Sequence, residues 1–129
     1  MPKFSVYSKQ RLATCHADIR KVCEQLIKTY DFSVTCGHRG KKDQDKAVAE
    51  GKSKAVWPTS AHNKLPSLAV DLVPYPVDWE DIGRFKELAA AFFAVANMMY
   101  ELGIIKSKFE WGGNWRKLKD FPHFEIKEK

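Results

Sequence analysis

A histidine and an aspartate nine residues apart have the chemistry of a metal site. His62 follows Ser60 in a polar loop, and Asp71 lies within the apolar segment Leu-Ala-Val-Asp-Leu-Val. In a strand, the two-residue period places Asp71 on one face with Ala69 and Val73. A carboxylate there costs free energy unless a positive group pairs with it. A zinc ion, which histidine and aspartate can bind, would supply that charge; a lysine partner or a solvent-facing position would also explain Asp71.

A second histidine with nearby carboxylates occurs in the segment Asp-Phe-Pro-His-Phe-Glu at positions 120–125. Alternation predicts that His123 and Glu125 share one face of a strand, while Phe124 takes the other. Pro122 disfavours helix at the residue before it, so Asp120 is expected in a bend that enters the strand. A carboxylate beside a potential metal ligand suits a general base that acts on water.

Helices and strands in irregular order must position these residues. Ser8 and Asp78 are typical helix N-caps, and Gly51 and Gly103 are typical of residues that follow a helix. His16 falls inside the first expected helix, as a surface or boundary residue. The expected helices are 8–30, 43–50 and 79–102, and the expected strands are 31–36, 67–73, 109–113 and 123–127, with a loop over 52–66. This order predicts an α+β fold with a small, largely antiparallel sheet packed with helices.

Length and composition are those of one folded domain. The 129 residues are 44% hydrophobic, which excludes a disordered chain and allows a core without disulfides. We therefore expect a single domain over residues 1–129. Three cysteines leave at least one thiol unpaired, and Cys15 and Cys23 lie too far apart on one expected helix to bridge. This cysteine usage indicates a reducing site of synthesis.

Targeting and membrane signals are not evident in the sequence. The first ten residues lack the apolar stretch of a signal peptide, and the longest apolar run, 88–96, is nine residues long. A membrane span needs about twenty, so we expect no membrane insertion. The net charge of +6 fits solubility alone or a polyanionic partner, either nucleic acid or an anionic cell envelope.

Several short motifs occur in an order that resembles one enzyme family. Ser-x-His at 60–62, Ala-x-Asp at 69–71, Trp-Gly-Gly-x-Trp at 111–115 and Asp-x-x-His at 120–123 follow one another along the chain. Residues 32–39 are similar to the family's strand leading to an arginine, and Gln44 follows at a familiar distance. The set resembles the zinc D-alanyl-D-alanine carboxypeptidase and L-alanyl-D-glutamate peptidase family, and within it the short single-domain phage endolysins. This resemblance implies a hedgehog/DD-peptidase-like fold.

The resemblance also implies a role for each matching residue. Zinc would be bound by three side chains, with the fourth position open, as in catalytic zinc sites. The implied zinc ligands are His62, Asp71 and His123; the catalytic residues are Asp120 and Arg39; the substrate-binding residues are Arg39, Ser60, Trp115 and His38.

Some positions leave alternatives open or depart from the family pattern. Trp115 follows two glycines and either lines a cleft or packs in the fold. His38 stands where an aromatic residue often precedes the arginine, and either contacts substrate or packs. The nine-residue separation of His62 and Asp71 replaces the family's usual seven, so we expect a bulged loop with both ligands in place.

The implied activity is hydrolysis of peptidoglycan stem peptides at the L-Ala–D-Glu bond by a zinc-dependent monomer. The resemblance implies synthesis in the cytoplasm of a phage host without a signal peptide, and action on the cell wall after release by a holin. Cleavage of terminal D-Ala–D-Ala by a carboxypeptidase is the alternative within the family.

Two other functions compete with this one. A basic nucleic-acid-binding module would use residues 39–54 and exposed aromatic side chains, but it leaves Asp71 in its apolar strand unexplained. We therefore expect no nucleic-acid partner. A non-catalytic wall-binding domain would keep the fold and the zinc, and the presence of Asp120 argues against it.

Overall fold

The computed structural model describes residues 2–117 and 119–127 of the chain. Its elements, in chain order, are α1 (Val6–Leu12), α2 (Ala17–Leu26), β1 (Phe32–Cys36), α3 (Lys41–Ala49), the 3₁₀ turn η1 (Ala61–Asn63), β2 (Ala69–Pro74), α4 (Ile82–Glu101), β3 (Phe109–Trp111), the 3₁₀ turn η2 (Gly112–Asn114) and β4 (His123–Ile126).

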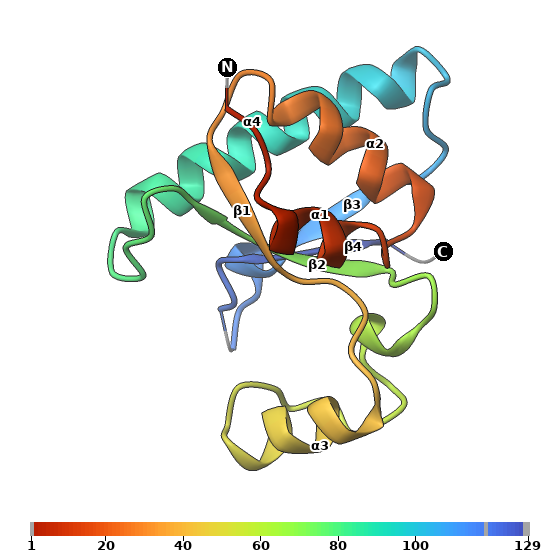
Figure 1. The fold of residues 1–129 in the computed structure, drawn as a ribbon, viewed down its shortest axis with the longest axis vertical. Coiled ribbons are helices and arrows are strands. Elements are labelled where there is room, and N and C mark those ends of the chain that lie inside the picture. The colour runs from red at the N-terminus through yellow and green to blue at the C-terminus, as the bar shows by residue number, and fades with distance from the viewer. Residues whose placement is uncertain (1, 118, 128–129) are drawn as a thin grey trace.

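The four strands form one sheet in the order β1-β2-β4-β3, and every neighbouring pair is antiparallel. The register of β2 and β4 places Asp71 opposite His123 and Val70 opposite Phe124. The α+β class and the antiparallel sheet expected from the sequence are confirmed. Figure 1 shows α2 and α4 together on one side of the sheet, and α3 well apart from them at the bottom of the view.

The hydrophobic core lies between the sheet and the helices α2 and α4. Ile19 and Val22 of α2 and Phe92 of α4 are fully buried. The ring of Phe92 lies 4.4 Å from that of Phe124 on β4, between centroids. Because side chains alternate along a strand, Phe124 faces this core while His123 faces the opposite side of the sheet. The core therefore holds the strand that carries the histidine.

The first expected helix is interrupted. Residues 13–16 leave the helix because their backbone pairs with the segment before β2: Ser67 N donates to Thr14 O at 2.8 Å, and His16 N donates to Ser67 O at 2.9 Å. The prediction of one helix over 8–30 is therefore wrong. Ser5, not Ser8, caps α1, and His16 lies at the N-cap of α2, where its Nδ1 accepts from Asp18 N.

The last helix begins later than expected. Its N-cap is Asp81, whose carboxylate accepts a hydrogen bond from Arg84 N, whereas the Asp78 carboxylate accepts from Glu80 N in the preceding turn. The prediction of Asp78 as the cap is therefore wrong, and Trp79 belongs to the turn. The remaining elements agree with the sequence expectations to within a few residues. Within the described residues, no helix combines the length and the apolarity that crossing a membrane requires.

A buried aspartate joins α2 to the segment that precedes β3. Asp18 is 7% exposed, and its Oδ2 accepts hydrogen bonds from the backbone N–H groups of Lys106 and Ser107, both at 3.1 Å, and from the Ser107 hydroxyl at 2.7 Å. Burial by itself raises the pKa of this carboxyl, but the hydrogen bonds, led by that of the Ser107 hydroxyl, outweigh it and lower the pKa below its usual value.

Replacing Asp18 is expected to destabilise the fold. The variant Asp18→Ala leaves two backbone donors without their partner and lowers the free energy of unfolding at pH 7 by about 2 kcal/mol. Because the folded-state pKa is lowered, this contribution is complete above the unfolded-state pKa of about 3.9 and disappears as the pH falls through the folded value. Urea denaturation of both proteins between pH 7 and pH 3 measures the difference. Glu24→Ala, on the exposed side of the same helix, is the control; an equal loss there would contradict the assignment.

Candidate metal centre and its cleft

Three side chains from separate elements meet at the sheet face opposite the core. His62 Nε2 lies 3.2 Å from Asp71 Oδ1 and 3.3 Å from His123 Nδ1, and His123 Nδ1 lies 3.4 Å from Asp71 Oδ1. Asp71 and His123 meet because β2 and β4 pair at these residues. The three atoms form a nearly equilateral triangle.

The turn η1 carries the third member of this triangle. The Ser60 hydroxyl accepts from His62 N, and the Asn63 side chain accepts from Ser60 N, a reciprocal capping arrangement. Outside the turn, Arg39 N donates to His62 O at 2.7 Å. The backbone of η1 is therefore fixed at both ends, and the nine-residue separation from Asp71 does not keep the imidazole away from the carboxylate.

The electrostatics of the triangle favour positive charge. His62 and His123 are 2% and 6% exposed, and the Asp71 side chain is 17% exposed. Burial alone would lower both histidine pKa values, but the Asp71 carboxylate raises the pKa of His62 to about 10 and that of His123 to about 9. Burial would likewise raise the pKa of Asp71, yet the two imidazoles hold it well below its usual range. The triangle therefore attracts cations.

The outer nitrogens of both rings have their own partners. His62 Nδ1 lies 2.8 Å from Gly37 O, and a carbonyl can only accept. His123 Nε2 lies 2.6 Å from Glu125 Oε1. In the neutral rings these contacts place the protons on the outer nitrogens, which leaves the lone pairs of His62 Nε2 and His123 Nδ1 directed at the triangle. This role of Glu125 goes beyond the expectations from the sequence, although its place two residues after His123 on the same strand face is the signal for it.

The donor set matches what zinc requires. Two imidazole nitrogens and one carboxylate oxygen are common catalytic zinc ligands, and ligands at about 2.0–2.1 Å in a tetrahedron are roughly 3.3 Å apart. The observed separations of 3.2–3.4 Å agree with that spacing.

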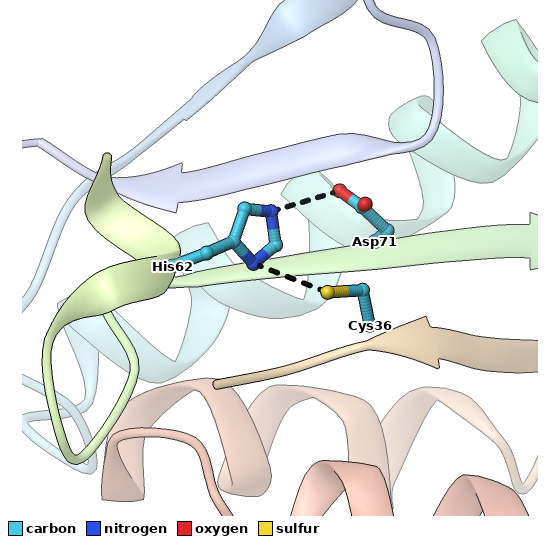
Figure 2. A group of neighbouring side chains, drawn as sticks. All are labelled: Cys36, His62 and Asp71. Atoms are coloured by element: carbon cyan, nitrogen blue, oxygen red, sulfur yellow. Dashed lines mark hydrogen bonds and ion pairs between the residues drawn. The ribbon is translucent and has the colours of Figure 1, made fainter. Parts of the chain in front are cut away.

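A second combination of donors contains a thiol. Cys36, His62 and Asp71 also offer donor atoms that all lie within 4.8 Å of one another. Figure 2 shows the Cys36 sulfur and the Asp71 carboxylate beside different nitrogens of the His62 ring. Cys36 Sγ is 3.7 Å from His62 Nδ1, the nitrogen already bonded to Gly37 O. Because His62 Nδ1 bonds Gly37 O, the nitrogen left to bind an ion is His62 Nε2, which faces Asp71 and His123. The ligand set His62, Asp71 and His123 is therefore favoured over the set that contains Cys36.

Arg39 lies beside the triangle and is held by a buried glutamine. Its Nη2 lies 3.8 Å from Asp71 Oδ2, and its Nη1 donates to Gln44 Oε1 at 3.0 Å. Gln44 is fully buried in α3, and the same oxygen accepts from Asn63 Nδ2. The glutamine thus couples α3, the arginine and η1. Only the family spacing of Gln44 is evident from the sequence, because a glutamine surrounded by charged residues on a helix gives no sign of burial.

Asp120 lies at the other side of the triangle, with its Oδ2 3.9 Å from His123 Nδ1. Burial, reinforced by the nearby Asp71 charge, raises the pKa of Asp120 above its usual value. Its backbone N donates to Gly112 O, and a Cβ on Gly112 would collide with the Asp120 carbonyl. Gly112 of the Trp-Gly-Gly-x-Trp motif is therefore required for the Asp120 backbone to pack this close to it. The Trp115 ring lies 5.0 Å from the His123 ring, between centroids.

A cleft of about 1670 Å³ opens over these residues. Seven of the eight residues predicted from the sequence line it: Arg39, Ser60, His62, Asp71, Trp115, Asp120 and His123. His38 is not among its lining residues, and its Nδ1 lies 2.9 Å from Lys64 O in the neighbouring loop. Basic side chains line the rim, namely Lys52, Lys54, Lys64, Lys117, Lys119 and Lys127.

This fold and this cleft point to the class of hydrolases that use a cation in their chemistry. Comparison with known proteins gives the family. The protein-family model described as phage L-alanyl-D-glutamate peptidase matches residues 1–129, and the chain belongs to this family. The resemblance found in the sequence motifs is thus confirmed.

Two relatives agree with this assignment. The peptidoglycan L-alanyl-D-glutamate endopeptidase CwlK of Bacillus subtilis (strain 168) is 30% identical over 111 residues, which are 77% of this chain. The match spans 62% of CwlK, less than two thirds of its length. The crystal structure of the L-Ala D-Glu endopeptidase ChiX of Serratia marcescens superposes with a TM-score of 0.77 at 31% identity, over 97% of this chain and 90% of that of ChiX.

Proposed function

We propose that the protein is a zinc-dependent endopeptidase that hydrolyses the L-Ala–D-Glu bond of peptidoglycan stem peptides. The observation that carries the proposal is the triangle of His62, Asp71 and His123, whose donor separations of 3.2–3.4 Å suit one zinc ion. The named activities of CwlK and ChiX support the choice of bond.

In the proposed mechanism, water adds to the scissile carbonyl carbon and the C–N bond breaks. His62, Asp71 and His123 would hold the zinc ion, which would supply Lewis acidity that makes the attacking water more acidic and polarises the carbonyl. Asp120 accepts the proton of the attacking water on its carboxylate and passes it to the leaving amine nitrogen; its raised pKa favours the second transfer. Arg39, oriented by Gln44, stabilises the negative charge that develops on the carbonyl oxygen.

The other residues of the cleft orient the substrate. Ser60 holds the turn that carries His62, and Trp115 covers the His123 ring. The lysines of the rim attract the carboxylates of an acidic stem peptide. His38 has no part in this proposal, since it is not among the cleft-lining residues and its Nδ1 lies 2.9 Å from Lys64 O.

We further infer that residues 1–129 form one peptidase domain that acts as a monomer on the cell wall. The support is that one hydrophobic core cluster joins α1, α2, α4 and all four strands, and that one chain supplies every residue of the proposed site. Release from a host cytoplasm by a holin belongs to the same proposal and rests on the phage family.

Digestion of purified muropeptides tests the reaction, its metal dependence and the bond together. The purified protein is expected to release products cut between L-Ala and D-Glu, detected by mass spectrometry. Treatment with a chelator should abolish cleavage, and added zinc should restore it, because the three ligands hold the ion reversibly. Loss of terminal D-Ala alone would identify a carboxypeptidase instead, and full activity in the chelator would reject zinc catalysis.

Two substitutions separate the possible ligand sets. His123→Ala removes a proposed ligand and is expected to weaken zinc binding by more than about 100-fold, whereas Cys36→Ser should retain about one zinc per chain. Zinc content after dialysis against a competing chelator, measured by plasma mass spectrometry, gives both results. His38→Ala is the matched control outside the cleft. Loss of zinc from the Cys36 variant with retention in the His123 variant would reverse the assignment.

The carboxylate of Asp120 is expected to act in turnover and not in metal binding. Asp120→Ala should keep its zinc and its melting temperature but lose at least about 100-fold in kcat, the usual contribution of a positioned general base. The isosteric Asp120→Asn should lose as much. Rates on muropeptides, compared with zinc content, make the distinction; near wild-type turnover in either variant would mean that another group moves the proton.

A further inference from the structure

An exposed tryptophan lines the cleft outside the proposed catalytic residues. Trp79 lies in the segment 75–81 between β2 and α4 and is 56% exposed. One side of its indole stacks on Phe85, with ring centroids 5.9 Å apart and planes inclined by 26°. Phe85 is 2% exposed, so it is part of the fixed interior. The indole is therefore supported from below by the core and open to solvent above.

The segment that carries Trp79 is fixed by several hydrogen bonds. Glu80 N donates to the Asp78 carboxylate at 3.0 Å, and Asp81 N donates to Asp78 O. The Arg84 guanidinium of α4 donates to Pro76 O at 2.6 Å. An aromatic surface that is already ordered loses little conformational entropy when a ligand covers it.

Aromatic rings connect this surface to the catalytic end of the cleft. The Phe85 ring lies 6.4 Å from that of Phe121, between centroids, and Phe121 follows Asp120 in the chain. Both phenylalanines line the cleft together with Trp79. In Figure 1, α3 lies well apart from the turn that precedes α4. The cleft thus has an aromatic surface near α4, while Lys52 and Lys54 line it near α3 and Lys119 lines it beside Trp115.

The proposed substrate has a sugar on one side of the scissile bond and acidic groups on the other. L-Ala is the first residue of the stem and is joined to the lactyl group of a muramic acid, so a sugar ring lies one residue and one lactyl group, roughly 7 Å of chain, from the scissile bond. The acidic residues of the stem lie on the other side of that bond. A cleft of about 1670 Å³ also exceeds the roughly 300–1,000 Å³ of a small-ligand site. The cleft therefore has room for more of the substrate than the two residues whose peptide bond is cleaved.

We infer that Trp79 forms a sugar subsite, in which its open face stacks on a pyranose ring of the glycan strand. The C–H face of a pyranose is apolar and covers an aromatic ring, while its hydroxyl groups stay in water. The stem then runs from Trp79 across the metal centre, with its carboxylates toward Lys52 and Lys54. This inference rests on the proposed function and adds that the enzyme distinguishes glycan-linked stems from free peptides.

Two substrates with the same scissile bond test the subsite. For Trp79→Ala, kcat/KM is expected to fall about tenfold on a disaccharide-linked tripeptide, the effect of losing one aromatic stacking contact, and to stay unchanged on the free tripeptide. Trp79→Phe should lose less. Tyr75→Ala is the control, because Tyr75 is 57% exposed in the same segment but is not among the cleft-lining residues. An equal loss on both substrates, or no loss on either, would overturn the subsite.

Binding of the sugar alone separates this inference from the proposed function. Titration of the wild-type protein with the disaccharide GlcNAc–MurNAc, followed by indole fluorescence, is expected to saturate; affinity should weaken about tenfold in the Trp79→Ala variant and by less in the Trp79→Phe variant. Absence of binding to the wild-type protein at millimolar disaccharide would reject the subsite. Saturable binding without any peptide hydrolysis would support the subsite and reject the proposed reaction. Melting temperatures of the variants identify any loss that comes from the contact with Phe85.

Discussion

The pairing of β2 with β4 is the constraint on which the site depends. Its register places Asp71 opposite His123 and, one residue along, Val70 opposite Phe124. Because side chains alternate at every residue, the same register sends Phe124 into the core and His123 into the cleft. A shift by one residue would bury an imidazole among aromatic rings and expose a phenyl ring. The free energy of the core therefore holds two of the three donors in place, independently of any ion.

One carboxylate faces three cationic or hydrogen-bonding groups in this arrangement. Asp71 Oδ1 lies within 3.4 Å of both imidazoles, and Oδ2 lies 3.8 Å from the Arg39 guanidinium. Gly37 O and Glu125 occupy the outer ring nitrogens, so the inner nitrogens face each other and the Asp71 carboxylate, and His123 Nδ1 also lies 3.9 Å from Asp120 Oδ2. Without an ion, protons fill this space, and the histidine pKa values of about 10 and 9 follow from it. Binding of a cation must displace those protons, which makes affinity depend on pH.

The order of the expected helices and strands predicted the fold class, and alternation predicted the common face of His123 and Glu125. The group of residues that line the cleft followed from the resemblance to the family, with His38 as the exception. Such local patterns do not predict contacts between residues that are far apart in the sequence. The Ser67 backbone interrupts the first helix at Thr14 and His16, although the helical periodicity continues through them. Gln44 is buried because Arg39 and Asn63 contact its amide oxygen while Ser53 and Ala55 accept from its amide nitrogen. Trp79 lies in a turn because Asp81, not Asp78, caps α4.

Lysines line the rim of the cleft, whereas its floor holds the carboxylates of Asp71 and Asp120, and distance and solvent keep the rim charges from these carboxylates. The rim lysines line the opening, and among the described residues none lies within 4 Å of Asp71 or Asp120. Exposed charges are screened within about 10 Å at 0.1 M salt, whereas the contacts of Asp71 are short and largely shielded from water. The floor thus attracts a cation at close range despite the positive rim. The rim in turn acts on acidic groups farther from the centre, so it would raise the encounter rate of an anionic ligand at low salt.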